Sequence, residues 1–212
     1  MEWGILVIAI VFLIVGYIVL QGTRASLAWR RAAARGDVEV IRQMVDDAIE
    51  TWASMKRPKE VAPELWRAVQ SVDLVDVGPE SVRVSCQVEG EYRQVEGRWV
   101  ETTSLLQQAF AATARLADML LYDIPNLRLA GARIDVYTTF REPENPPRHS
   151  CIMTTTAERE TAREVDWDEW TAEQVVDALG GRYRLGERGA ALPLELQDEG
   201  ESPSGVETRV EG

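Results

Sequence analysis

The feature that most constrains this chain is an unbroken apolar run from Trp3 to Leu20, which contains no charged residue and no proline. A helix rises about 1.5 Å per residue, so the run is just long enough to cross a hydrocarbon core of about 30 Å. Trp3 and Tyr17 lie near its two ends, where aromatic rings favour the headgroup region. The run therefore predicts a single transmembrane helix that anchors the chain.

The charges around this run predict its orientation. Four arginines follow it: Arg24, Arg30, Arg31 and Arg35. No Lys or Arg precedes it, so the positive-inside rule places Met1 outside and the rest of the chain in the cytoplasm, and we expect a bacterial inner membrane. The arginines are expected to lie against anionic headgroups. A cleaved signal peptide is disfavoured, because Glu2 stands where a basic segment would be needed.

Composition limits what the remaining chain can do. The net charge is −12, with 35 acidic and 23 basic residues, and an acidic surface repels phosphate backbones, so we expect no nucleic-acid partner. The acid-rich C-terminus has little apolar pattern and predicts a disordered acidic tail. The expected organisation is an anchor at 1–22, a juxtamembrane helical segment at 23–60, an α+β domain at 61–193 and the tail at 194–212.

The juxtamembrane segment contains a clear amphipathic helix. Asp37 is placed to cap a helix that begins at Val38. Its apolar stripe has helical spacing: Val38, Ile41, Val45, Ala48, Trp52 and Met55. The same register extends back to Leu27, so a parallel coiled coil, and with it homo-oligomerisation, is an open alternative. Gly36 interrupts that register and favours packing of the helix on its own domain.

The next segments change to strand periodicity. Val72–Val77 is a short strand, and apolar residues alternate with polar ones from Val82 to Val88. Turn residues follow, so we interpret Ser81–Thr102 as an antiparallel meander. The segments 128–140 and 149–156 form a second hairpin. These hairpin connections, without regular strand–helix–strand alternation, predict an α+β fold with an antiparallel sheet and packed helices.

Three helices accompany these strands. Pro63 opens a short one, and Ser104 with Gln107 forms a capping box that begins a core helix ending near Tyr122. Asp166 or Asp168 is expected to start the last helix, which the Gly180–Gly181 pair ends.

Few residues in the sequence suggest chemistry. Cys86 and Cys151 are too few for a zinc site, although His149 and Cys151 lie two residues apart on one strand face. A Cys–His pair is the core of some nucleophilic sites, but no third orienting residue accompanies it. We therefore predict no catalytic, cofactor-binding or metal-binding residues. Whether Cys86, His149 and Cys151 have a chemical role stays open.

One surface motif suggests a partner. Trp167, Asp168, Glu169 and Trp170 combine aromatic and acidic side chains, as interaction patches do. The alternative is a helix start in which the acids favour the positive end of the helix dipole and Trp170 packs inward.

These observations favour a binding protein over an enzyme. We expect a single-pass membrane protein whose cytoplasmic α+β domain binds or scaffolds other membrane or membrane-associated proteins, with the lipid bilayer as a further partner. The alternatives are an enzyme with a noncanonical site in the α+β domain and a structural subunit of a larger membrane complex.

Overall fold

The computed structural model describes residues 11–18, 21, 29–95, 98–140, 146–186 and 189–196. Among these residues no helix is both long enough and apolar enough to cross a membrane. Of the predicted span, residues 3–10 and 19–20 lie outside the described part of the chain, and residues 11–18 are helical. Residues 197–212 of the predicted tail also lie outside the described part of the chain.

Helix α2 (Val38–Ser54) confirms the predicted amphipathic helix. The Asp37 side chain accepts a hydrogen bond from Val40 N at 3.3 Å, as the cap requires. The stripe packs on the chain's own domain, where Ile41, Val45 and Trp52 are buried. Gly36 has a φ of 76°, and a Cβ there would lie 2.9 Å from Pro79 Cβ, so the chain turns sharply before α2. This turn interrupts the continuous stripe that a coiled coil would need.

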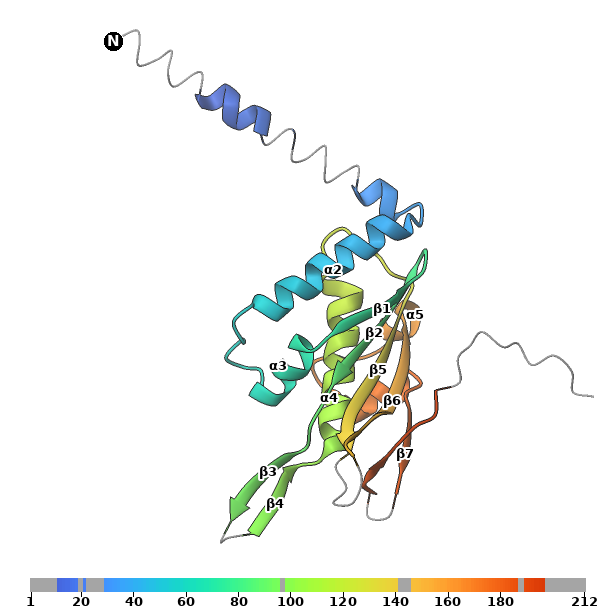
Figure 1. Cartoon of the computed structure of the whole chain (residues 1–212). Helices are drawn as coiled ribbons and strands as arrows, with labels where there is room; N and C mark the ends of the chain where they lie inside the picture. The colour runs from blue at the N-terminus through green and yellow to red at the C-terminus, as the bar shows by residue number, and fades with distance from the viewer. Residues whose placement is uncertain are drawn as a thin grey trace, which may run out of the picture.

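The first strands lie in two separate sheets. Helix α3 (Pro63–Gln70) has the expected proline at its start and leads into β1 (Asp73–Val77), which pairs antiparallel with β2 (Ser81–Gln87). Strands β3 (Glu91–Val95) and β4 (Arg98–Thr103) pair only with each other and form a hairpin at the end of the main sheet (Figure 1). The antiparallel pairing of β3 with β4 agrees with the predicted meander, but the expected pairing of β2 with β3 is wrong.

Helix α4 (Leu105–Asp118) is the predicted core helix, and both hydrogen bonds of the Ser104–Gln107 capping box are present. A π-helical turn, η1 (Met119–Asp123), continues it to the predicted end. Leu116 and Leu120 lie on its buried face, with exposed fractions of 0% and 1%.

The chain then completes a six-stranded sheet in the order β1-β2-β5-β6-β7-β8. The remaining elements are β5 (Gly131–Phe140), β6 (Arg148–Glu158), α5 (Arg159–Ala162), α6 (Ala172–Ala178), β7 (Arg182–Leu185) and β8 (Ala191–Leu192). The β5–β6 hairpin confirms the second predicted hairpin. The α+β class is confirmed, but the sheet is mixed rather than antiparallel. Strand β5 lies parallel to β2 because the segment between them, which contains α4, returns the chain to the end of the sheet where β2 begins.

The two faces of the sheet differ in chemistry. Register places Val84, Ile134 and Val136 on the face that packs against α4 and its neighbouring helices (Figure 1). The opposite, open face carries Arg83 and Asp135, among other polar side chains. The domain therefore has one helical layer on one side of its sheet.

The last helix begins later than the sequence analysis places it. Asp166 Oδ1 accepts hydrogen bonds from the backbone N–H groups of Asp168 and Glu169, so these residues form a turn. Helix α6 instead starts after Thr171, which forms a second capping box with Gln174. The helix ends before Gly180, whose φ of 72° fits the predicted glycine stop.

The burial of α4 predicts the cost of truncating its core side chains. Leu116→Ala or Leu120→Ala should each lower the free energy of unfolding by about 2–5 kcal/mol, because each leaves a cavity beneath the sheet. The measurement is denaturant unfolding of a fragment that begins at Trp29. Leu185→Ala, at a side chain 55% exposed, is the matched control and should cost less than about 0.5 kcal/mol. Equal losses at all three positions would contradict the packing described above.

Candidate functional site

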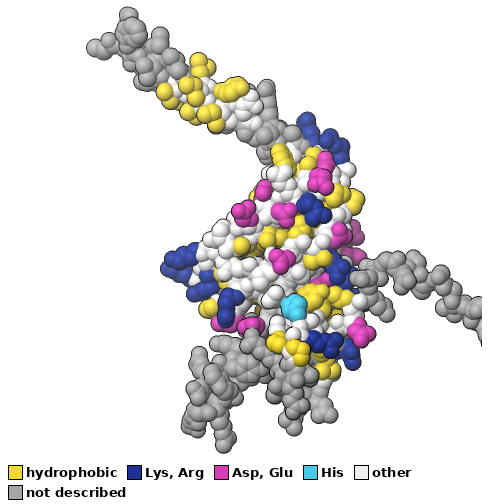
Figure 2. Space-filling view, in the orientation of Figure 1, with side chains coloured by type: hydrophobic (Ala, Val, Ile, Leu, Met, Phe, Trp, Pro, Cys, Tyr) yellow, Lys and Arg dark blue, Asp and Glu magenta, His cyan; other side chains and the backbone are white. Residues whose placement is uncertain are grey.

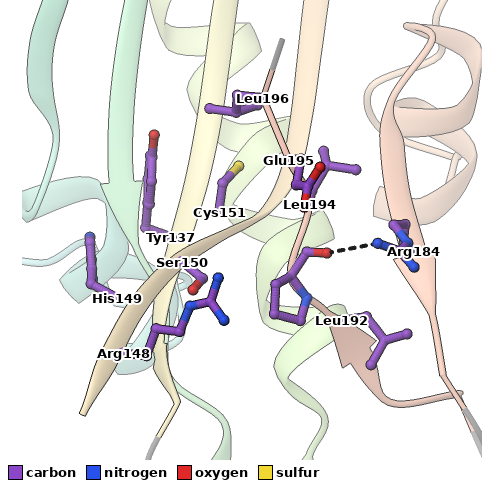
Figure 3. A pocket seen from close by; sticks show the side chains of 11 residues that line it. Tyr137, Arg148, His149, Ser150, Cys151, Arg184, Leu192, Leu194, Glu195 and Leu196 are labelled. Carbon is purple, nitrogen blue, oxygen red and sulfur yellow. Dashed lines mark hydrogen bonds between the residues drawn. The ribbon is translucent and has the colours of Figure 1, made fainter. Parts of the chain in front are cut away.

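The open face of the sheet ends in a groove of about 540 Å³ between the β5–β6 hairpin and the segment that follows β7. Figure 3 shows its two walls. One wall carries Tyr137 and residues 148–151, and the other carries Arg184 and residues 192–196. The groove is thus built from segments that are distant in the sequence.

Two backbone features form the groove. The β5–β6 register shifts between Val136 and Tyr137, so that Tyr137 lies opposite Cys151. Such a bulge bends a strand and increases its twist. Beyond the bulge, Leu194 N donates a hydrogen bond of 2.7 Å to Cys151 O, which holds the C-terminal segment along β6. Arg184 Nη1 donates to Pro193 O at 3.5 Å and links this segment to β7 (Figure 3).

The groove combines an apolar lining with positive charge. Its apolar lining includes the side chains of Leu192, Leu194 and Leu196. Arg148 and Arg184 are exposed at its sides, and Glu195 is the one carboxylate among its lining residues. Figure 2 shows hydrophobic and basic side chains gathered around the single histidine on this face. A locally positive groove is notable in a chain whose net charge is −12.

The aromatic wall is held by stacking. The rings of Tyr137 and His149 are nearly parallel, at 8°, with their centroids 5.0 Å apart. Burial raises the pKa of Tyr137, and the nearby charges of Cys151 and Asp135 raise it further against the opposing effect of two arginines. The phenol is therefore protonated at neutral pH, which makes this wall a flat surface with a hydrogen-bonding edge.

Both thiols are buried and held in the neutral form. Burial raises the pKa of Cys86 to about 12, and the charges of Cys151 and Asp135 act in the same direction. Burial also raises the pKa of Cys151 to about 11, and its Sγ donates to Met153 O at 3.2 Å. The thiolate is the nucleophilic form of cysteine, so these environments oppose nucleophilic catalysis near neutral pH.

The structure places His149 and Cys151 beside the same groove, but their side chains have different surroundings. His149 is exposed and stacks on Tyr137, whereas the Cys151 side chain is 4% exposed. Within the described ranges, no three His, Cys, Asp or Glu side chains are grouped so that they could hold a metal ion.

The centre of the open face carries a buried ion network. Asp135 is fully buried and accepts hydrogen bonds from Arg83 Nε at 2.7 Å, from Arg133 Nε at 3.1 Å and from Thr154 Oγ1 at 2.5 Å. These residues come from three neighbouring strands. A carboxylate that is buried and fully hydrogen-bonded in this way joins the strands, and its removal would leave two arginines facing each other.

The other residues singled out from the sequence lie away from the groove. Arg24 lies outside the described residues, and Arg30, Arg31 and Arg35 are exposed before α2. Trp167 is half-buried, donates to Ala162 O at 3.1 Å and packs edge-to-face against Tyr122. Trp170, which the alternative interpretation packs inward, is 41% exposed. Asp168 and Glu169 are exposed beside it, and the patch stays a predicted partner surface.

Sequence reasoning missed the groove because it ended the domain at residue 193. The signal was present: Leu192, Leu194 and Leu196 alternate with other residues, as in an extended segment with one apolar side. Strand β7 was not predicted from the sequence either; it has only four residues, too few to show a clear alternation.

The raised pKa values predict slow thiol chemistry in the folded protein. At pH 8 the thiolate fraction of both side chains is therefore far below the value of about a quarter expected for an ordinary thiol. Alkylation by iodoacetamide should therefore be at least about a hundredfold slower in the native protein than in denaturant. Mass spectrometry of each cysteine over time measures both rates. A thiol that reacts rapidly at acidic pH would contradict the buried environments.

Comparison of the chain with protein-family models, curated proteins and solved structures finds no match. The functional interpretation therefore depends on the groove, the buried thiols and the position of the arginines.

Proposed function

We propose that this protein is a single-pass membrane-anchored binding module that holds a partner polypeptide at the cytoplasmic face of a bacterial inner membrane. The observation that carries the proposal is the groove, which is apolar and positively charged in an acidic chain. It lies at the opposite end of the β5–β6 hairpin from the point where the N-terminal segment joins the domain (Figure 1).

The exposure of the N-terminal helical residues supports an anchor. Residues 11–18 are helical and all exposed, and Phe12 and Leu13 have exposed fractions of 73% and 74%. Consecutive exposed apolar residues cost free energy in water, whereas lipid removes that cost. Arginines follow this run, which favours a cytoplasmic domain.

The direction of the strands supports presentation of the groove away from the membrane. Strand β5 has 10 residues, so it extends about 30 Å. Its first residue, Gly131, donates to Glu80 O, next to the Pro79 that lies against Gly36. Tyr137 lies far along the strand, in the groove. A domain tethered through residues 29–35 would therefore hold the groove well away from the headgroups.

The lining indicates the chemistry of the partner. An extended chain places alternate side chains on the same side, about 7 Å apart, which suits a groove lined by alternating leucines. Arg148 and Arg184 at its sides favour carboxylates on the partner. We therefore propose an extended segment with apolar residues and flanking acids.

The ionisable groups of the groove favour binding over catalysis. The Cys151 thiol and the Tyr137 phenol both have raised pKa values. Both groups are therefore protonated at neutral pH, and the anion that would act as a nucleophile or base is scarce. Stacked rings, leucines and exposed arginines are typical of the aromatic and charged contacts that stabilise protein interfaces.

The anchor makes a direct prediction about topology. A reporter active only in the cytoplasm, fused after Gly212, should be active, and the protein should stay in the membrane fraction after alkaline carbonate extraction. The reason is the arginine excess after the apolar run. Deletion of residues 3–20 is the control and should release the protein into the soluble fraction. Activity of an exported reporter at the same site would contradict the orientation.

The groove makes a prediction about binding. The full chain in detergent should bind a fluorescent peptide of alternating glutamate and leucine more tightly than one of alternating lysine and leucine. Arg148→Glu with Arg184→Glu should weaken binding of the acidic peptide about tenfold or more, since two favourable charge interactions become repulsive. Fluorescence anisotropy measures the affinities.

The matched control is Lys56→Glu with Lys59→Glu, which makes the same change in net charge at exposed sites away from the groove. It should leave the affinity for the acidic peptide within about twofold. Equal weakening by both double variants would show that the groove has no specific role.

A further inference from the structure

A second cavity, of about 420 Å³, lies at the end of the domain where the N-terminal segment enters. Ala33 and Ala34, before α2, form one side of it, and the loop after η1 forms another. Three arginines from distant parts of the sequence line it: Arg30, Arg128 and Arg159. We call it the arginine pocket.

Arg159 is held in a fixed orientation. Its Nε donates to Leu129 O at 2.5 Å, and its Nη2 donates to Leu121 O. Its guanidinium lies 5.1 Å from the centroid of the Tyr122 ring. These contacts use the backbone and a ring rather than a carboxylate, so they position the charge without neutralising it.

Several positive charges lie close together at this site. Burial lowers the pKa of Arg159; Tyr122 opposes this effect, and the charges of Arg128 and Arg163 add to it. Arg30 and Arg128 are exposed. None of these arginines forms an ion pair with a carboxylate of the described chain, in contrast to Arg83 and Arg133, which share Asp135.

We propose that the arginine pocket binds a phosphate group. Guanidinium groups present paired N–H donors that match phosphate oxygens, and Arg is therefore typical of phosphate sites. Asn126 also lines the pocket, and its residue type carries an amide group that can donate to an anion. The lining contains no Asp or Glu that would repel an anion.

The position of the pocket favours the phosphate of an anionic lipid headgroup over a soluble phosphate. Arg30 lies ten residues after Leu20, and ten residues span at most about 35 Å, so the pocket cannot be far from the end of the apolar run. The preference for lipid depends on the proposed anchor, whereas the affinity for phosphate does not.

Native mass spectrometry of the full chain in neutral detergent tests the proposal. Added phosphatidylglycerol should leave one retained lipid per chain, and phosphatidylcholine should leave little. Arg30→Gln with Arg128→Gln should weaken retention roughly 25-fold, since each cation near an anionic lipid contributes about a fivefold factor. Both side chains are exposed, so this variant should fold, and its thermal unfolding midpoint checks that it does.

Lys56→Gln with Lys59→Gln is the matched control, with the same change in net charge outside the pocket, and it should retain the lipid as the wild type does. A second arm titrates inorganic phosphate into the full chain and follows the displacement of phosphatidylglycerol. Displacement in the wild type supports a phosphate site that the lipid headgroup fills.

A different result would be that the wild type binds inorganic phosphate, the pocket variant does not, and phosphatidylglycerol is retained no better than phosphatidylcholine. This result would support the phosphate site and assign it a soluble ligand. Equal lipid retention by the wild type, the pocket variant and the control, together with no phosphate binding, would overturn the proposal. Failure of the groove peptide to bind would contradict the proposed function and leave these measurements unaffected, because the two sites share no residue.

Discussion

The parallel pairing of β2 with β5 is the constraint on which the rest of the structure depends. Parallel neighbours require a crossover, so residues 88–130 must leave the sheet at one end and return to the other. This requirement lays α4 across the sheet and leaves β3 and β4 to pair with each other. The same register puts Val84 beside Ile134 on the helical face and Arg83 beside Arg133 on the open face, so one register separates the core from the charged network.

The charged network and the arginine pocket differ in whether a carboxylate balances their arginines. Asp135 is buried and receives hydrogen bonds from two arginines and one threonine, so the cost of removing these charges from water is offset by short contacts. The arginine pocket lacks such a carboxylate among its lining residues, and its charges remain available to an anion. The contrast is the reason to treat the first cluster as structural and the second as a binding site.

The long β5–β6 hairpin separates the two proposed sites. The arginine pocket lies near the beginning of β5 and the end of β6, and the groove lies toward the opposite ends of these strands. A strand of 10 residues is about 30 Å long, so a ligand at one site would not touch a ligand at the other. In this proposal the arginine pocket contacts a lipid headgroup beside the membrane, and the groove contacts a partner polypeptide away from it.

The sequence by itself determined the features that depend on neighbouring residues. Asp37 and the Ser104–Gln107 pair mark helix starts because a cap and its N–H partners lie within one turn, and the alternation through β2 marks a strand with one buried face. Only the tertiary structure decided which strands pair in parallel, since the period of two is the same in both arrangements. It also decided both sites: Leu194 N donates a hydrogen bond to Cys151 O, and Arg30, Arg128 and Arg159 line one pocket, although these residues are distant in the sequence. Both sites form because segments that are distant in the sequence pack around one sheet.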